Sequence, residues 1–344
     1  MAPDTLIDAA FWRGRRVLVT GHTGFKGSWL ALWLHRLGAQ VTGFAADPPT
    51  APSLFELARV GELVEDVRGD VRDAGAVRHA ARRARPEVVL HLAAQPIVRT
   101  SLEDPPATYA VNVVGTANVL DATRDAVVVC VTSDKCYTPA LHAHREDAPL
   151  GGPDPYSSSK AAQELVASAY RQSFGVRVAT ARAGNVIGGG DWARDRLLPD
   201  LARAAVSGEP VVVRNPAAVR PWQHVLGPLS GYLLLAQRLA QSADWAAGWN
   251  FGLAPEQARP VGWVVERVAE AWGVDVRLAE GGDAIEDPAL RLDAAAARER
   301  LGWVPAWDLA AGLAATVSWY AHQRGGSDAR ALTLDQITDY EEGL

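Results

Sequence analysis

Residues 17–27 read VLVTGHTGFKG, a short apolar run followed by glycines at Gly21, Gly24 and Gly27. The apolar run predicts a buried strand, and the segment after the last glycine predicts a helix. A Gly-x-x-Gly-x-x-Gly loop in this place is typical of dinucleotide-binding folds, because glycines permit a tight turn and the helix N-terminus receives a pyrophosphate. A plain glycine-rich turn is the alternative. The loop residues expected to contact a cofactor are Gly21, Thr23, Gly24, Phe25, Lys26 and Gly27.

Short apolar runs and longer amphipathic segments alternate from this loop to about residue 183. This alternation predicts an α/β fold, a Rossmann-type doubly wound parallel sheet that is buried on both faces. We expect residues 1–183 to form mainly the NAD-binding domain. Residues 184–344 should form mainly a smaller C-terminal substrate-binding lobe, with some segments returning to the large domain. Strands are expected at 17–19, 41–44, 88–90, 127–131, 176–180 and 211–213, and helices near 27–37, 73–84, 107–123, 156–174, 226–240 and 261–272.

Residues after the later strands extend the predicted cofactor site. Asp47 lies twenty residues beyond Gly27, near the end of the second strand, where a carboxylate can hold a ribose 2′-hydroxyl. No Arg occurs between Val41 and Thr50 to accept a 2′-phosphate, so NAD is favoured over NADP. A turn residue before the two prolines is the alternative for Asp47. The other cofactor candidates are Asp70, Val71, Leu92, Ala93, Ala94, Gln95, Asn112, Thr132, Tyr156 and Lys160.

Composition argues against several other classes of protein. The chain has 344 residues, and its 34 Lys and Arg against 40 Asp and Glu give a net charge of −6, so no basic footprint for nucleic acid is predicted. Neither a signal-peptide core nor about 18 consecutive apolar residues occurs, which predicts a cytoplasmic protein without a membrane span. Cys130 and Cys136 are expected to be free thiols. No spacing of His, Cys and Asp suggests a metal site.

A second group of motifs predicts acid–base chemistry. Tyr156 and Lys160 are four residues apart, so a helix that starts at Pro155 would place them on one face. An ammonium beside a phenol favours the phenolate, which can take a proton from a substrate hydroxyl. The dipeptide Asp134-Lys135 follows the fifth strand. A solvated ion pair at a strand end is the alternative for that dipeptide.

Together these motifs resemble the extended short-chain dehydrogenase/reductase superfamily and, more narrowly, the CDP-glucose 4,6-dehydratase family. The resemblance runs from about residue 11 to residue 344, and the combination is far more specific than any one motif. The segments that carry it are Gly21 to Trp29, Thr132 to Tyr137, Asp154 to Lys160, Gly184 to Trp192, Arg214 to Pro216, Arg220 to Val225, Leu301 to Trp303 and Ala331 to Gln336.

The resemblance implies conversion of CDP-D-glucose to CDP-4-keto-6-deoxyglucose with internally recycled NAD. Tyr156 would remove the proton of the 4-hydroxyl while C4 passes a hydride to NAD, water would leave across C5 and C6, and the hydride would return to C6. By position, Lys135 would be the base and Asp134 the acid of the elimination. Ser133 would hydrogen-bond the 4-oxygen, and capping of the strand end is the alternative for Ser133. A lysine is normally protonated at pH 7, so we expect burial and the nearby Lys160 to lower the pKa of Lys135.

The smaller lobe supplies the candidates for substrate binding. Arg guanidinium suits phosphate geometry, so Arg220 and Arg196 are expected to hold the diphosphate, with Asn185 nearby. A surface ion pair is the alternative for each Arg, and a core position is the alternative for Trp222 and His224. The resemblance also implies a homodimer through the helices near 107–123 and 156–174, with a tetramer left open. The full set of substrate candidates is Asn185, Arg194, Arg196, Arg214, Arg220, Trp222 and His224.

Three departures from the family pattern lie on the substrate side. The stretch Thr138 to His144 is short and lacks the usual aromatic residues, Gly227 stands where Glu is usual, and Asp287-Pro288-Ala289 replaces His-Glu-Ala. These departures leave the identity of the nucleotide base and of the sugar undecided, more than the type of reaction. The alternatives are an NAD-dependent dehydratase of another nucleotide sugar, a nucleotide-sugar epimerase or dehydrogenase, and a non-catalytic NAD-sensing protein.

Overall fold

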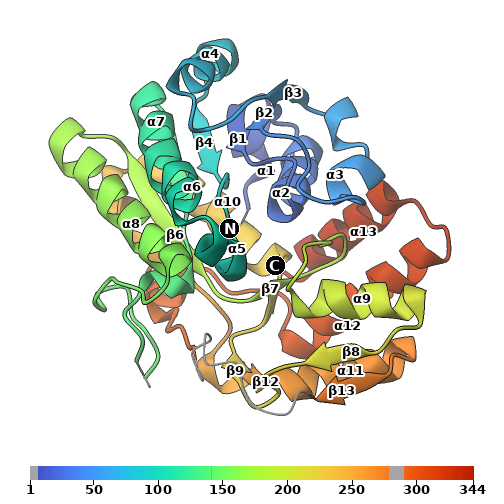
Figure 1. Cartoon of the computed structure of the whole chain (residues 1–344). Helices are drawn as coiled ribbons and strands as arrows, with labels where there is room; N and C mark the ends of the chain where they lie inside the picture. The colour runs from blue at the N-terminus through green and yellow to red at the C-terminus, as the bar shows by residue number, and fades with distance from the viewer. Residues whose placement is uncertain (1–6, 141, 279–289) are drawn as a thin grey trace.

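The computed structural model describes residues 7–140, 142–278 and 290–344. Its centre is a seven-stranded sheet with the order β11-β6-β5-β4-β1-β2-β3 (Figure 1). Every neighbouring pair in this sheet is parallel, and the strand order on either side of β1 is that of a doubly wound Rossmann sheet, which confirms the predicted fold class. The strands are Arg16–Thr20 (β1), Gln40–Ala45 (β2), Glu65–Arg68 (β3), Val88–His91 (β4), Val127–Val131 (β5), Val178–Ala183 (β6) and Gly248–Phe251 (β11).

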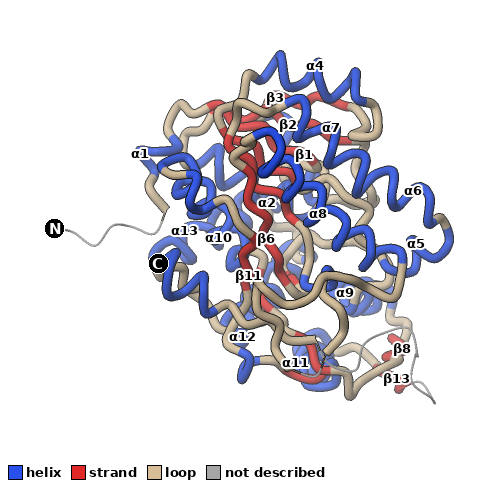
Figure 2. Tube along the Cα trace, turned by 90° about the vertical axis from the view of Figure 1, so that its left-hand side faces the viewer, coloured by secondary structure: helices blue, strands red, loops and turns tan. Residues whose placement is uncertain are grey.

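Alternate residues of the strands pack into two separate apolar layers. In β1, Val17 and Val19 belong to one buried cluster and Leu18 belongs to the other. Successive side chains of a strand point to opposite faces, so an uninterrupted apolar strand requires helices on both sides. Figure 2 shows α4, α7 and α8 on one side of the sheet and α10 and α13 on the other. The flanking helices are Phe25–Arg36 (α2), Ala74–Ala84 (α4), Gly115–Ala122 (α7), Pro155–Phe174 (α8), Leu226–Gln241 (α10) and Ala329–Glu342 (α13).

Segments from beyond residue 184 return to the sheet. Strand β11 pairs with β6 and completes one edge, and α10 packs against β5 and β6. Helix α13 covers α2, where Trp33 Nε1 donates to Glu341 Oε1 at 2.7 Å and the Trp33 ring meets Tyr340 edge-on. This cover explains why α2 can be apolar around most of its circumference.

The helix expected near 107–123 is interrupted. It consists of Pro105–Tyr109 (α6), a wider π turn at Ala110–Val114 and α7. Such a turn often marks a functional position in a helix, because it displaces the side chains of that turn from regular spacing. Here it carries Asn112, one of the expected cofactor residues. Short helices flank the main layers at Ala9–Trp12 (α1), Leu54–Leu57 (α3) and Val98–Glu103 (α5).

Most of the remaining elements lie together at the bottom of Figures 1 and 2, and we call this group of elements the smaller lobe. Three two-stranded sheets, β7 with β10, β9 with β12 and β8 with β13, brace its helices. The strands are Val186–Ile187 (β7), Val211–Val213 (β8), Val219–Arg220 (β9), Gln223–His224 (β10), Arg259–Pro260 (β12) and Val276–Leu278 (β13). The helices are Leu197–Ser207 (α9), Val261–Trp272 (α11) and Leu309–Arg324 (α12). Across the described chain, short 3-10 or π turns also occur at Val60–Glu62, Asp134–Cys136, Ala243–Trp245, Pro255–Gln257 and Ala297–Leu301. In the described part of the chain, no helix has the length and apolarity of a membrane span, and no cluster of His, Cys, Asp and Glu suits a metal ion.

Candidate active site

The segment after β5 carries the predicted acid–base pair. Ser133 caps the 3-10 turn that follows, where its Oγ accepts from the amide of Lys135 at 3.1 Å and donates to Asp134 Oδ1 at 2.9 Å. Asp134 is buried, and its Oδ2 has no hydrogen-bond partner among the described residues. Burial raises the pKa of Asp134, although the charges of Lys135, Arg220 and Lys26 and the Ser133 hydrogen bond oppose this. Asp134 is therefore a carboxyl group suited to giving up a proton to a ligand.

Helix α8 positions Tyr156 and Lys160. Asp154 caps the helix and Pro155 occupies its first turn, so both side chains project from its buried face. Lys160 Nζ donates to the carbonyl of Val131 at the end of β5 at 3.4 Å and lies 5.9 Å from the centroid of the Tyr156 ring. The helix thus brings the phenol and the ammonium to the carboxyl end of β5.

We expect from the sequence that the phenolate form of Tyr156 is favoured, which requires a lowered pKa, and this expectation is wrong. Burial raises the pKa of Tyr156 to about 12, and a hydrogen bond with Ser133 opposes the rise only in part. Burial also lowers the pKa of Lys160 to about 8. Both shifts have one cause, because burial removes water from the charged form of each group and so favours the neutral form.

The glycine loop has the geometry that its sequence predicts. Gly21 has φ of +78°, and a Cβ there would lie 2.7 Å from the amide nitrogen of Ala93, while a Cβ on Gly27 would lie 2.1 Å from Gly21 O. Gly24 begins α2 without a side-chain cap, so the first amides of the helix stay available to an anion. Lys26 lies in the first turn, where burial and the nearby charges of Arg196 and Lys160 lower its pKa to about 7. The other two loop candidates lie beside this turn: Thr23 Oγ1 donates to Ala46 O at 3.0 Å, and the ring of Phe25 lies against Gly188.

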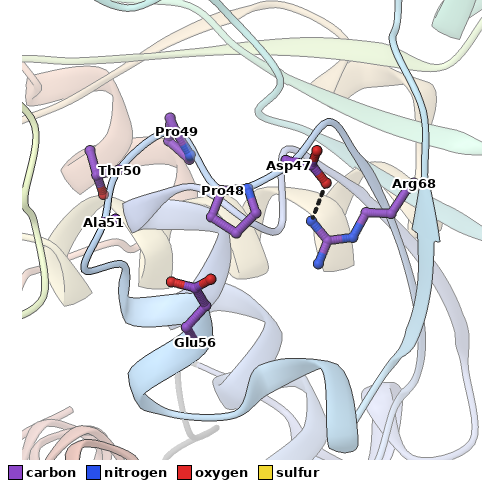
Figure 3. Close-up of a pocket in the computed structure, with 7 residues that line it drawn as sticks. All are labelled: Asp47, Pro48, Pro49, Thr50, Ala51, Glu56 and Arg68. Atoms are coloured by element: carbon purple, nitrogen blue, oxygen red, sulfur yellow. Dashed lines mark ion pairs between the residues drawn. The ribbon is translucent and has the colours of Figure 1, made fainter.

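Asp47 lies at an open pocket of about 480 Å³ beyond β2 (Figure 3). Its side chain is 94% exposed and lies 3.5 Å from Arg68 Nη1. Arg68 lies on β3, outside the range 41–50 in which the sequence contains no arginine. An arginine therefore does lie beside Asp47, although none occurs near it in the sequence. The residues that line the pocket are Asp47, Pro48, Pro49, Thr50, Ala51, Glu56 and Arg68.

The remaining cofactor candidates follow β3, β4 and β5. The pKa of Asp70 is lowered by its hydrogen bonds and ion pair with Arg72. Asn112 accepts from the amide of Gln95 at 2.8 Å and donates to Ser159 Oγ at 2.8 Å, so it joins the loop after β4 to the helix turn before Lys160. Of the others, Val71 and Thr132 are buried, and Leu92, Ala93, Ala94 and Gln95 are partly buried.

The candidates for substrate binding fall into two groups. Arg196 and Arg220 lie within electrostatic range of the catalytic groups: Arg196 acts on Tyr156, and Arg220 acts on Asp134. Arg196 is also paired with Asp191 at 2.9 Å. Arg194 and Arg214 are exposed, and Arg214 lies 3.3 Å from Asp195.

Three further candidates lie in the smaller lobe. Asn185 is partly buried, and its carbonyl accepts from the amide of Gln223 at 3.0 Å. Trp222 is buried and donates to Arg259 O at 3.2 Å. His224 is buried against Trp29 and Trp307, and burial lowers its pKa to about 3. This position favours the core role that was the alternative for His224.

A buried polar cluster behind the catalytic segment was not recognised in the sequence. Glu164 and Arg182 form a 2.7 Å ion pair with both side chains nearly inaccessible, and Arg182 Nη1 donates to Tyr137 Oη at 2.6 Å. The available signal was the spacing of Tyr156, Lys160 and Glu164, which recur every four residues on one helix.

Comparisons with known proteins identify the family of the chain. The model of the NAD dependent epimerase/dehydratase family matches residues 17–248. The CDP-glucose 4,6-dehydratase of Salmonella typhimurium is 47% identical, with 97% of this chain and 98% of that protein covered. The dTDP-glucose 4,6-dehydratase of Streptomyces griseus is 33% identical over 90% of this chain and 94% of its own length.

A solved structure of a related enzyme has a similar fold. The crystal structure of the dTDP-glucose 4,6-dehydratase of Streptomyces venezuelae, with NAD bound, superposes with a TM-score of 0.79 at 27% identity and covers 92% of this chain and 99% of that one. The match to the family model spans more than half of the chain, and the curated relatives extend the similarity to nearly its full length. The chain therefore belongs to the NAD dependent epimerase/dehydratase family.

Proposed function

We propose that this protein is a CDP-glucose 4,6-dehydratase, a hydro-lyase that converts CDP-D-glucose to CDP-4-keto-6-deoxyglucose and regenerates its NAD. The observation that carries the proposal is the buried Asp134 carboxyl, with one oxygen unpartnered among the described residues, next to Ser133 and Tyr156. Oxidation of a sugar hydroxyl requires the tyrosine and the lysine but no such acid, whereas loss of water requires a proton for the leaving oxygen. The 47% identity to a CDP-glucose 4,6-dehydratase supports the same reaction and the same nucleotide.

The residues present fit NAD. The uncapped start of α2 suits a pyrophosphate, Gly21 and Gly27 leave no room for a Cβ, and Asp47 lies at an open pocket beyond β2, where a ribose would be held. Asp70, Gln95 and Asn112 would extend the site along the carboxyl ends of the strands. When bound, NAD would supply the redox chemistry, as the acceptor of a hydride from the sugar and later as the donor of one.

The chain's own groups move the protons. Tyr156 takes the proton of the 4-hydroxyl, and Ser133, its hydrogen-bond partner, holds the 4-oxygen. Lys160 stabilises the phenolate form of Tyr156 that accepts this proton. Once C4 is a ketone the C5 proton is acidic, and Lys135 removes it while Asp134 protonates the departing 6-hydroxyl, which leaves as water. The proton held by Lys135 later returns to C5, and the proton taken by Tyr156 passes through solvent to Asp134, so each group regains its starting protonation state.

The smaller lobe supports binding of the diphosphate. Arg196 contributes positive charge near Tyr156, and Arg220 contributes positive charge near Asp134. Guanidinium groups suit the paired oxygens of a diphosphate, and Asn185 adds an amide close by. The exposed Arg194 and Arg214 have the weaker position, because each must first order a solvated side chain.

We also infer a homodimer located in the cytoplasm. Large apolar side chains are exposed on the π turn before α7 and on α8, namely Val114, Leu165 and Phe174. A patch of this kind suits an isologous contact between two copies.

Mass spectrometry of the product tests the proposal. The purified protein is incubated with NAD separately with CDP-, dTDP-, GDP- and UDP-glucose. We expect loss of one water from the CDP sugar without net formation of reduced nicotinamide. Loss of water from another sugar nucleotide would retain the mechanism and change the specificity. Net reduced nicotinamide, or inversion without a change in mass, would instead favour a dehydrogenase or an epimerase, and no reaction with any substrate would favour the NAD-sensing alternative.

A further inference from the structure

A continuous buried polar network lies behind the catalytic segment. Its centre is Glu164 on α8, one turn beyond Lys160 and two turns beyond Tyr156. Glu164 accepts four hydrogen bonds, from Thr132 Oγ1 at 2.5 Å, Thr180 Oγ1 at 2.6 Å, and Arg182 Nε and Nη2 at 2.9 and 2.7 Å. The network thus begins on the helix that carries Tyr156 and reaches β5 and β6.

Arg182 continues the network to β11 at the edge of the central sheet. Its Nη1 donates to Tyr137 Oη at 2.6 Å and to Glu146 O at 2.9 Å, and Tyr137 Oη donates to Asn250 Oδ1 at 2.7 Å. Asn250 lies on β11 and donates from Nδ2 to His144 O and Asp293 O, both at 2.9 Å. The chain from Glu164 to Asn250 therefore links α8 to the segments that contain His144 and Asp293.

Space for this network is built into β11. A Cβ on Gly248 would lie 2.3 Å from Arg182 Nη2, so a glycine at this position leaves room for the guanidinium. The Tyr137 ring stacks on His144 at 4.8 Å and also lies beneath the Arg182 guanidinium at 5.0 Å. The tyrosine is therefore fixed by its ring as well as by its hydroxyl.

The network fixes both ends of the segment that holds the acid–base pair. Thr132 precedes Ser133, and Tyr137 follows Lys135 by two residues; the side chains of Thr132 and Tyr137 end on Glu164 and Arg182 respectively. Neither Glu164 nor Arg182 is exposed towards a ligand. An ion pair buried in this way contributes little net stability compared with apolar residues of the same shape, but it does impose one arrangement on its neighbours.

We propose that Glu164 and Arg182 are positioning residues, which keep the segment carrying Asp134 and Lys135 in register with Tyr156 and Lys160. Thr132 and Tyr137 transmit this constraint to the two ends of the segment, and Asn250 connects it to the substrate side. The inference rests on the proposed function, because register between the two pairs matters when one site both oxidises C4 and removes water across C5 and C6. Burial alone raises the pKa of Glu164, but the hydrogen bonds and charge of Arg182 and the two threonines outweigh it, so the pKa is lowered and the carboxylate remains charged.

Two variants test the proposal. Tyr137→Phe removes only the hydroxyl between Arg182 and Asn250, and Glu164→Gln removes the charge while keeping the shape. Ser230→Ala is the matched control, because Ser230 is equally buried and accepts from Trp303 Nε1 at 2.9 Å, away from the catalytic segment. The measurements are kcat and KM with CDP-glucose, the isotope effects for substrate deuterated at C4 or at C5, and hydrogen exchange of the amides of residues 133–137.

Positioning predicts a specific pattern. We expect kcat of both variants to fall about 10- to 100-fold, because small displacements of reacting groups are costly in rate, while KM changes little. The isotope effect at C5 should rise relative to that at C4, and amides 133–137 should exchange faster. Ser230→Ala should lower stability without either change.

The absence of these changes in isotope effect and amide exchange would overturn the positioning proposal. Unchanged isotope effects and unchanged exchange at residues 133–137, in folded variants with lowered stability, would make the network an ordinary part of the core. If the unmodified protein removes water from no nucleotide sugar, the proposed function fails separately. Hydrogen exchange in Tyr137→Phe still decides whether the network orders residues 133–137.

Discussion

At the scale of single residues, burial governs the charge of the groups that would move protons. Burial raises the pKa of Asp134 and Tyr156 and lowers the pKa of Lys26 and Lys160. In each case the neutral form gains, because the site is poorly solvated. We therefore expect Asp134 to start as the protonated acid. Tyr156 starts as a phenol and must give up its proton before it can act as a base.

Replacing Tyr156 by Phe should abolish oxidation of the sugar and leave NAD binding intact. General acid–base groups contribute about 10²- to 10⁴-fold in rate, so the loss should fall in or beyond this range. Product formation and fluorescence titration with NAD measure the two effects. Tyr170→Phe, on the same helix and only partly buried, is the control and should retain full turnover. Turnover retained by Tyr156→Phe would remove this phenol from the mechanism.

Asp134→Asn should block loss of water while still permitting oxidation. The pKa of Asp134 is raised in the folded protein, so the proton-donating form predominates at low pH and is lost as the pH rises through that raised pKa. The rate of water loss should therefore fall with rising pH, and the variant should lack this limb of the profile. The folded state also binds the Asp134 proton more tightly than the unfolded state, so stability falls as the pH rises between the two pKa values. Asp134→Asn should reduce this loss of stability in thermal unfolding; a pH–rate profile identical to that of the unmodified protein would exclude the acid role.

At the scale of secondary-structure elements, the start of α8 supports both fold and site. Asp154 accepts from the amide of Ser157 at 2.9 Å and from its hydroxyl at 2.6 Å, and Tyr156 lies within the turn that these bonds secure. The cap therefore stabilises the helix and also fixes the position of the phenol.

Asp154→Ala should cost about 1 kcal/mol of unfolding free energy, the usual cost of losing a helix cap. We expect kcat to fall as well, because the first turn of α8 loosens around Tyr156. Asp73→Ala is the control: Asp73 caps α4 through the amides of Gly75 and Ala76, away from the catalytic groups. It should cost similar stability, measured by urea unfolding, without loss of activity. Equal activity in the two variants would show that the α8 cap does not position the tyrosine.

At the scale of the whole molecule, the proposed dimer depends on one apolar surface. Leu165 is 62% exposed on α8, and Val206 is 68% exposed on α9 in the smaller lobe. A charge placed in an isologous contact meets its own copy and so opposes association twice.

Leu165→Arg should therefore shift the protein to monomers in sedimentation velocity, whereas Val206→Arg should leave the dimer intact. Each variant adds the same charge at a similarly exposed position, so net charge is controlled. A dimer that survives Leu165→Arg but dissociates with Val206→Arg would place the interface on the smaller lobe, and a monomeric unmodified protein would refute the dimer.

The sequence by itself determined the α/β class, the cofactor loop and the pairing of Tyr156 with Lys160. These depend on local periodicity, on glycines in a strand-to-helix turn and on spacing within one helix, all of which are encoded within about twenty residues. The tertiary structure decided what depends on distant contacts. Arg68 reaches Asp47 only because β3 lies beside β2, and β11 joins the sheet from beyond residue 184.

The tertiary structure also decided the direction in which the pKa of Tyr156 is shifted, because desolvation depends on all the groups that pack around the phenol. The same holds for the Glu164–Arg182 network, whose members lie on α8, β6 and the segment after β5. His224 stands within a sequence motif, but only the packing of Trp29 and Trp307 shows that it is enclosed by the core. Burial and pairing between distant segments are properties of the folded chain, and no local pattern specifies them.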